Sequence, residues 1–128
     1  MKKYLLIGAG GFMGALARYG IKSLPIDFHH PLLANLPYYT FIANITGSFL
    51  LGIILTATKK PRGGENVKYV AAVGFLGAYT TFSTFCKETV ILLGKGNYTG
   101  AFIYVTLSIL LGLVSCNVGI VTAKRLLY

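Results

Sequence analysis

The sequence predicts an all-α integral membrane protein that forms a single domain over residues 1–128, with four transmembrane helices. Only 12% of its 128 residues are charged and 55% are hydrophobic, whereas a soluble domain carries about 25% charged residues. Three windows, residues 31–58, 69–86 and 96–123, contain no Asp, Glu, Lys, Arg or His. A membrane-spanning helix needs about 20 predominantly apolar residues, so each window can supply one span.

The first helix is expected at about residues 4–24, where Arg18 interrupts an apolar stretch that begins at Tyr4. A cation inside a membrane usually faces a wet cavity, pairs with an anion or extends its side chain to the surface. Arg18 is therefore expected either to snorkel to the nearby interface or to bind an anion in a vestibule. A cleaved signal peptide is the competing interpretation, and it is disfavoured because no polar mature domain follows.

The other three helices are expected at about residues 38–58, 68–95 and 98–123, with turn-forming residues between them. The connection at 25–37 contains three prolines, and the connection at 59–65 is basic and rich in glycine. Small residues recur four positions apart on helices one, two and four. This spacing lets membrane helices approach each other closely, so we expect a tightly packed bundle.

The 12 lysines and arginines lie near the ends of the apolar windows, and they are divided unequally between the two sides. Four, including Arg18, fall on one side, and eight fall on the side that would hold both termini. The eight are Lys2, Lys3, Lys59, Lys60, Arg62, Lys68, Lys124 and Arg125. The positive-inside rule therefore predicts cytoplasmic termini. The same distribution argues against nucleic acid as the partner of this chain, despite its net charge of +9.

Hydroxyl side chains crowd the centre of the third apolar window. Four of them fall within positions 80–84, and such side chains offer backbone groups an alternative to helical hydrogen bonds. Gly77, just before them, loosens the helix further. We therefore expect helix three to be broken near residues 77–81. Carbonyls freed at such a break are hard oxygen ligands suited to a small cation.

Polar and aromatic side chains elsewhere suggest a path for an ion. Asn44 shares a helix face with Thr40, and its amide is expected either to join helices or to bind an ion. Phe82 and Phe85 also share a face. Ring edges carry positive charge and would favour an anion, although ordinary core packing is the simpler explanation of two phenylalanines.

Helix four adds two polar side chains to this suggested path, Tyr104 and Ser108, which are one turn apart. The carboxylate of Glu88 either serves the mouth of a path or pairs with Lys87. The sequence contains no nucleophile–base pair and no metal-ligand spacing, so no catalytic site and no enzymatic activity are expected.

Three segments are more specific than these patterns: residues 11–19 (GFMGALARY), 44–49 (NITGSF) and 74–85 (GFLGAYTTFSTF). In this order, in a chain of this length with four spans, they resemble the signature segments of the Fluc (CrcB-type) fluoride channels. The resemblance covers essentially the whole chain, and the TTFSTF string is highly specific in this setting. It implies an antiparallel, dual-topology dimer in the lipid bilayer, with two fluoride pores.

The resemblance also implies roles for individual residues. Arg18 would lie near an aqueous vestibule. The carbonyls of Gly77 and Thr80, two from each subunit, would hold a structural sodium ion (Na+) at the dimer centre. The residues implied in the fluoride pore are Thr40, Asn44, Phe82, Ser83, Thr84, Phe85, Tyr104 and Ser108. In this family the polar row of helix four often continues one turn past Ser108, whereas this chain has Gly112 there; water or Ser115 would then substitute.

An antiparallel dimer of one sequence should carry nearly balanced cations, and eight against four is not balanced. The partner is therefore either a second copy of this chain or a homologue that inserts in the opposite orientation. The homodimer is the favoured alternative because all the implied pore elements are present in this sequence.

The function implied is passive fluoride export across a bacterial inner membrane, which protects the cell from fluoride toxicity. Hydrogen fluoride enters from acidic surroundings and ionises inside. An inside-negative potential then drives the anion out by about 2.3 kcal/mol per 100 mV. The alternative is a proton-coupled antiporter of the small multidrug type, which needs a membrane carboxylate, with Glu88 as its candidate.

Overall fold

The computed structural model describes residues 1–24, 36–59 and 64–127, and all regular secondary structure in these ranges is helical. In chain order the elements are α1 (Lys2–Ile21), α2 (Tyr38–Ala57), α3 (Gly64–Val67), the π-helix η1 (Lys68–Leu76), α4 (Gly77–Tyr79), α5 (Phe82–Gly94) and α6 (Tyr98–Leu127). Elements α3, η1 and α4 follow one another without a gap, so residues 64–79 form one continuous helical rod.

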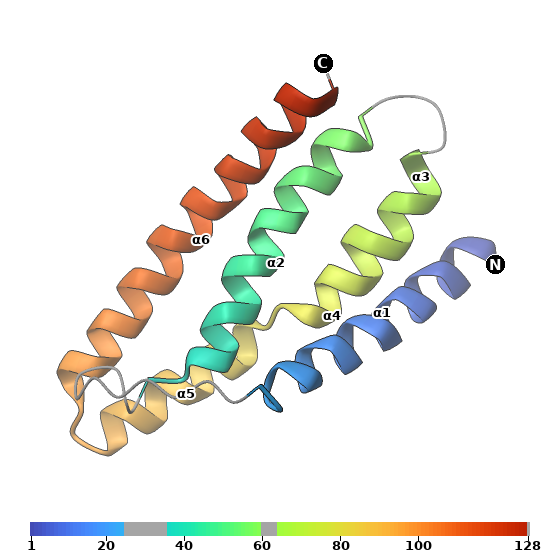
Figure 1. Ribbon diagram of the computed structural model, residues 1–128. Helices are drawn as coiled ribbons and strands as arrows, with labels where there is room; N and C mark the ends of the chain where they lie inside the picture. The colour runs from blue at the N-terminus through green and yellow to red at the C-terminus, as the bar shows by residue number, and fades with distance from the viewer. Residues whose placement is uncertain (25–35, 60–63, 128) are drawn as a thin grey trace.

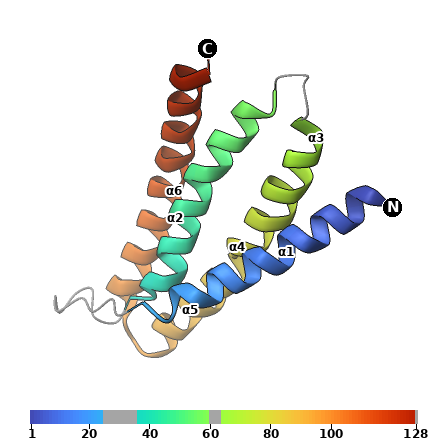
Figure 2. The ribbon, with the colours of Figure 1, turned by 45° about the vertical axis from the view of Figure 1, so that its right-hand side comes forward.

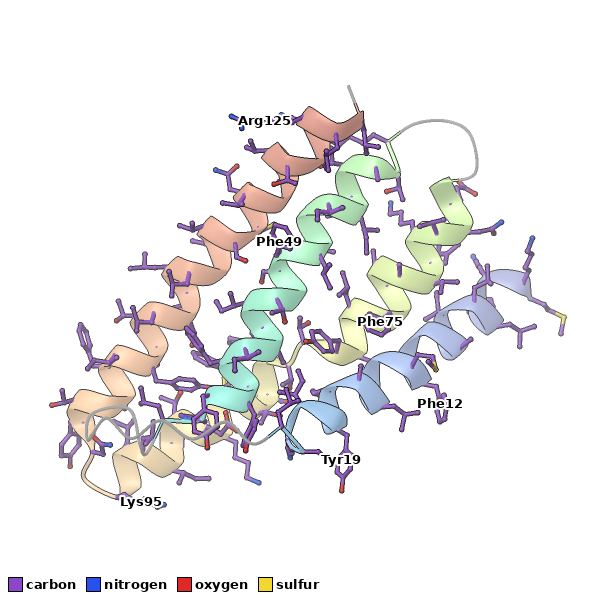
Figure 3. The ribbon with its side chains drawn as sticks, viewed as in Figure 1. Phe12, Tyr19, Phe49, Phe75, Lys95 and Arg125 are labelled. Atoms are coloured by element: carbon purple, nitrogen blue, oxygen red, sulfur yellow. The ribbon has the colours of Figure 1, made fainter. Side chains whose placement is uncertain are left out.

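The helices pack as two pairs. Helices α2 and α6 run side by side in the same direction, and α1 lies against η1 and α4 (Figures 1 and 2). Helix α5 turns away from the rod that precedes it and leads into α6. The two termini and the start of α3 lie toward one end of the bundle, and the α5–α6 turn lies toward the other. Lys95 and Arg125 mark these two ends (Figure 3).

The boundaries differ from the expected ones by at most four residues. The first helix, expected at 4–24, ends at Ile21, because the amides of residues 22–24 bond to carbonyls three positions back and tighten the last turn. The second and third helical segments, expected at 38–58 and 68–95, comprise Tyr38–Ala57 and, with an interruption, Gly64–Gly94. The fourth, expected at 98–123, continues to Leu127, since basic residues are favourable at a helix C-terminus. Residues 25–35 and 60–63, where most of two expected turns fall, lie outside the described part of the chain.

Three helical segments are long and apolar enough to cross a membrane: α2, residues 64–94 and α6. Helix α1 has the length of a span, 20 residues, but is not in this group, because five glycines and Arg18 dilute its apolar residues. Many large apolar side chains point outward, including Leu113 at 67% exposure and Phe12 at 65%. Figure 3 shows Phe12 and Tyr19 projecting from α1 away from the other helices.

Glycine permits the closest approaches between the helices. A Cβ atom added at Gly14 of α1 would lie 2.1 Å from the carbonyl oxygen of Phe75 in η1. A Cβ atom added at Gly52 of α2 would lie 2.2 Å from the carbonyl oxygen of Cys116 in α6. In a membrane, dispersion between closely packed backbones replaces the hydrophobic effect as the force that joins helices.

Candidate functional site

The third helical segment is interrupted at Thr80 and Thr81. Both residues have extended backbone, with φ −80° and ψ 157° at Thr80 and φ −151° and ψ 119° at Thr81. The hydroxyl of Thr80 donates to the carbonyl of Leu76 at 2.9 Å, and the helix ends there. Thr81 is the N-cap of α5, since its hydroxyl oxygen accepts from the Thr84 amide at 3.2 Å.

Asn44 of α2 supplies hydrogen-bond partners for the backbone amide and carbonyl of Thr81 at the interruption. Its Oδ1 accepts from the amide of Thr81 at 2.8 Å, and its Nδ2 donates to the carbonyl of the same residue at 3.2 Å. Non-helical backbone at membrane depth persists only where protein or water supplies its hydrogen bonds. The Asn44 amide therefore joins α2 to the interruption, which is one of the two roles expected from the sequence.

Two carbonyls near the interruption lose the donors that a continuous helix would supply. In a helix, the carbonyl of residue i accepts from the amide of residue i+4, so Gly77 would pair with Thr81 and Thr80 with Thr84. The Thr81 amide donates to Asn44 instead, and the Thr84 amide donates to the Thr81 hydroxyl. The Gly77 and Thr80 oxygens are thereby released from the helical ladder, and carbonyl oxygens are ligands that hard cations prefer.

Glu88 of α5 joins α2 to α6. One carboxylate oxygen accepts from the Thr40 hydroxyl at 2.9 Å, and the other accepts from the Tyr104 hydroxyl at 2.8 Å. Thr40 is 7% exposed and Tyr104 is 2% exposed, so both donors are buried. Of the two roles considered for Glu88, pairing with Lys87 is not formed among the residues the structure describes.

The two phenylalanines of α5 have different environments. Their ring centroids are 5.7 Å apart with a tilt of 32°. Phe85 packs against Tyr104, at 5.2 Å between centroids, and against a small core around Leu92 and Ala101. Phe82 is 78% exposed. Core packing therefore explains Phe85 and does not explain Phe82.

The hydroxyl of Ser108 is buried, and it has no hydrogen-bond partner within residues 1–24, 36–59 and 64–127. It lies one helical turn beyond Tyr104 on α6. Ser115, further along α6, donates to the carbonyl of Ile45 at 2.9 Å and so acts as a bridge to α2. An unsatisfied buried hydroxyl is unfavourable, so Ser108 is the residue of α6 best prepared to bind a ligand.

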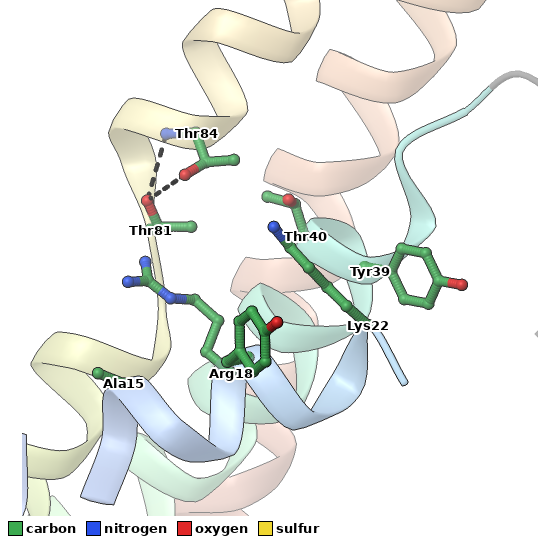
Figure 4. Close-up of a pocket in the computed structure, with 8 residues that line it drawn as sticks. Ala15, Arg18, Lys22, Tyr39, Thr40, Thr81 and Thr84 are labelled. Atoms are coloured by element: carbon green, nitrogen blue, oxygen red, sulfur yellow. Dashed lines mark hydrogen bonds between the residues drawn. The ribbon is translucent and has the colours of Figure 1, made fainter. Parts of the chain in front are cut away.

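A cavity of about 240 Å³ lies beside the interruption (Figure 4). Its lining combines cationic and hydroxyl side chains from three helices: Ala15, Arg18, Tyr19, Lys22, Tyr39, Thr40, Thr81 and Thr84. Arg18 extends from α1 toward Thr81 (Figure 4). Two cations over hydroxyl donors form a concave surface suited to a small anion.

Comparison with known proteins identifies the family of the chain. The family model described as "CrcB-like protein, Camphor Resistance (CrcB)" matches residues 5–120. The chain is 39% identical to the protein named fluoride-specific ion channel FluC of Caulobacter sp. (strain K31), over 98% of each chain. It is 39% identical to the protein of the same name from Ignicoccus hospitalis, over 99% of each. It is 42% identical to fluoride-specific ion channel FluC 2 of Clostridium acetobutylicum, over 91% of this chain and 93% of the relative.

The chain belongs to the CrcB family. With three segments that are apolar enough to span a bilayer, it is a multi-pass membrane protein of that family. The resemblance of its signature segments to the Fluc (CrcB-type) channels is thus confirmed over nearly the full length.

Within this CrcB chain, the structure brings most of the sequence-predicted site residues to the interruption. Ser83 and Thr84 contact the Thr81 hydroxyl, at 3.3 and 3.0 Å. The sequence did not single out Thr81. It also did not predict that the Glu88 carboxylate accepts hydrogen bonds from two hydroxyls. Glu88 lies three positions after Phe85 on the same helix face, and this spacing is the signal that could have linked Glu88 to the site.

Proposed function

We propose that this chain is a passive, fluoride-selective ion channel that exports cytoplasmic fluoride and thereby protects the cell from fluoride toxicity. The relatives that align with this chain over nearly their whole length are named fluoride-specific ion channels. The observation that carries the proposal in the structure is the buried Ser108 hydroxyl, which has no partner in the described part of the chain. A small anion would complete that hydrogen bond.

The path for the anion would begin at the cavity that contains Arg18 and continue along hydroxyl, amide and ring-edge donors. Such a path replaces the hydration shell of an ion with fixed dipoles, which is the usual basis of selectivity in channels. The residues proposed to line it are Thr40, Asn44, Phe82, Ser83, Thr84, Phe85, Tyr104 and Ser108. A channel of this kind needs neither a catalytic group nor a nucleotide site, because the membrane potential drives the anion outward.

The channel would be a dimer of antiparallel subunits. The exposed Phe82 supports this, because its ring edges can line a path only where a second surface covers them. The interruption at Thr80 and Thr81 supports it as well. Backbone that leaves the helix inside a membrane must be covered by protein or by a water-filled path, and a second subunit would supply the protein cover.

A structural sodium ion at the dimer centre fits the residues present. Each subunit offers two carbonyl oxygens, those of Gly77 and Thr80, whose helical donors are engaged elsewhere. Four such oxygens from two subunits would suit a hard monovalent cation. The ion would add positive charge between the two pores and hold the interrupted segments together.

Fluoride efflux from proteoliposomes that contain the purified chain tests the function. We expect efflux of fluoride on addition of a potassium ionophore, and no measurable efflux of chloride under the same gradient. Equal efflux of both anions, or no fluoride efflux from liposomes shown to contain folded protein, would contradict the proposal.

A proton-coupled antiporter remains the second candidate, because the structure places one carboxylate, Glu88, between α2 and α6. A carrier of this type would exchange the proton of that carboxylate for a cationic drug. Uptake of a quaternary ammonium compound, driven by a pH gradient and abolished by Glu88→Gln, would favour this candidate. Fluoride efflux that proceeds without a pH gradient would favour the channel.

A further inference from the structure

Helices α2 and α6 place two rows of side chains in register. Thr40 and Tyr104 meet at Glu88, and Gly52 packs against the carbonyl of Cys116. In each pair the two residues are 64 positions apart in the sequence (104 − 40 and 116 − 52). The helices run side by side in the same direction, and their contacts fall at offsets of 64 and of 70, the latter between Ile45 and Ser115 and between Phe49 and Gly119.

The offset of 64 also relates Asn44 to Ser108 and Ser48 to Gly112. At the first of these levels both helices supply a polar side chain. At the second, α6 supplies none, because residue 112 is glycine. A Cβ atom added at Gly112 would have the Ser48 hydroxyl oxygen as its nearest neighbour, at 3.8 Å. The Ser48 hydroxyl therefore lies within ordinary contact distance of the place that a side chain at position 112 would take.

The Ser48 hydroxyl is also open to the interruption. It lines a cavity of about 310 Å³ together with Asn44, Thr81 and Phe82. Within the described residues it makes no hydrogen bond, although a serine in a helix can return its hydroxyl to the carbonyl four residues back. Thr46 and Thr56 of the same helix do so, at 2.7 and 2.9 Å. The Ser48 donor thus remains available beside the residues proposed to line the path.

We propose that Ser48 is a fluoride-binding residue of the path, which donates its hydroxyl one turn beyond Asn44 at the level where α6 has Gly112. This inference rests on the proposed function and assigns the far end of the polar row to α2. Ser115, the other hydroxyl near that end, is unsuited to the role because it already donates to the Ile45 carbonyl at 2.9 Å.

Fluoride efflux from proteoliposomes of the full chain and its variants tests the assignment. Ser48→Ala should lower the rate by about tenfold, the effect of removing one hydrogen bond to a charged group. Ser48→Thr, which keeps the hydroxyl, should retain most of the rate. The double variant Ser48→Ala with Gly112→Ser should recover most of the lost rate, since it returns a hydroxyl to the same level from α6. Ser115→Ala is the matched control and should conduct like the unmodified chain.

The outcomes separate this inference from the function on which it rests. If the unmodified chain shows no fluoride-selective efflux, the proposed channel function fails. If it conducts and Ser48→Ala conducts equally well, only the role of Ser48 is overturned. The role is also overturned if Gly112→Ser alone conducts normally and yet does not rescue Ser48→Ala, or if Ser115→Ala is the variant that loses conduction. Size-exclusion chromatography in detergent is the control that each variant must pass, by eluting in the same assembly as the unmodified protein.

Discussion

At the scale of single residues, Asn44 and Glu88 have comparable positions. Each makes two hydrogen bonds between helical segments: Asn44 bonds α2 to the interruption, and Glu88 of α5 accepts one bond from α2 and one from α6. Asn44 forms hydrogen bonds with the Thr81 backbone groups that the interruption would otherwise leave unpaired. Glu88 accepts hydrogen bonds from the buried hydroxyls of Thr40 and Tyr104. Removing one partner of a buried hydrogen bond costs about 1–3 kcal/mol, so both residues support the fold as well as any path for an ion.

Asn44→Asp tests both contributions with almost no change in volume. The carboxylate cannot donate to the Thr81 carbonyl, so two acceptors would face each other where Nδ2 and that oxygen are now 3.2 Å apart. It would also place a negative charge beside an anion path, and like charges in apposition cost several kcal/mol. We expect fluoride efflux to fall by about 100-fold and thermal stability in detergent to decrease by about 1–3 kcal/mol. Normal efflux from Asn44→Asp would remove Asn44 from the path.

Phe82→Ile and Phe85→Ile form a second residue-scale test, because the same substitution is made in two environments. Phe82 is 78% exposed, whereas Phe85 packs on Tyr104 and its neighbours. We expect both variants to lose most fluoride efflux, through the loss of a ring edge. Only Phe85→Ile should lower the free energy of unfolding, by about 1 kcal/mol or more, and this loss should be visible as a lower melting temperature. A larger stability loss at Phe82 would mean that packing alone explains that ring.

At the scale of elements, close backbone contact determines how the helices pair. Small residues on α1 meet η1, and small residues on α2 meet α6, with backbone atoms as the nearest neighbours. A flexible side chain can move aside for a new methyl group, but a backbone carbonyl inside a helix cannot. The interruption at Thr80 and Thr81 is likewise a property of two elements together, because α2 supplies the amide that satisfies it.

Gly14→Ala and Gly8→Ala compare the same change at two positions of α1. The added methyl group at position 14 would meet the Phe75 carbonyl at 2.1 Å, whereas nothing lies within 4 Å of the one at position 8. We expect Gly14→Ala to destabilise the protein by about 1–3 kcal/mol and Gly8→Ala to stay within about 0.5 kcal/mol of the unmodified chain. Thermal unfolding in detergent measures both. Equal melting temperatures would show that α1 does not pack on η1 as closely as described.

At the scale of the whole molecule, the charge distribution and the proposed assembly make opposite demands. By sequence order, eight of the 12 cations are assigned to the side of the termini, which favours one orientation, whereas an antiparallel homodimer requires both. Either the bias is too weak to prevent dual insertion, or the chain pairs with a homologue of opposite orientation.

Reporter fusions to the C-terminus distinguish these two cases in cells. For the homodimer we expect reporters active in the cytoplasm and reporters active outside it to give comparable signals. Replacing both Lys124 and Arg125 by Gln should move the ratio toward the outside orientation, because it removes two of the eight cations. A purely cytoplasmic C-terminus, together with no fluoride efflux from the chain expressed alone, would point to an obligate partner.

Much of this organisation could be predicted from the sequence, because its physical cause is local. Charge-free windows are sufficient to indicate spans. Hydroxyls after Gly77 indicate where a helix is weak, and the signature segments that contain Asn44 and Phe82 identify the family. The range of η1 was expected to be helical, but its π-helical form was not foreseen.

Only the tertiary structure decided which partner each polar group finds, since that depends on residues far apart in the chain. Asn44 pairs with a backbone 37 positions away, and Glu88 collects hydroxyls from two other helices. Ser48 and Gly112 become neighbours because α2 and α6 run in register. The apolar pattern of the sequence determined that this chain enters a membrane, whereas the packing of α2 and α6 determined where its unpaired hydroxyls gather.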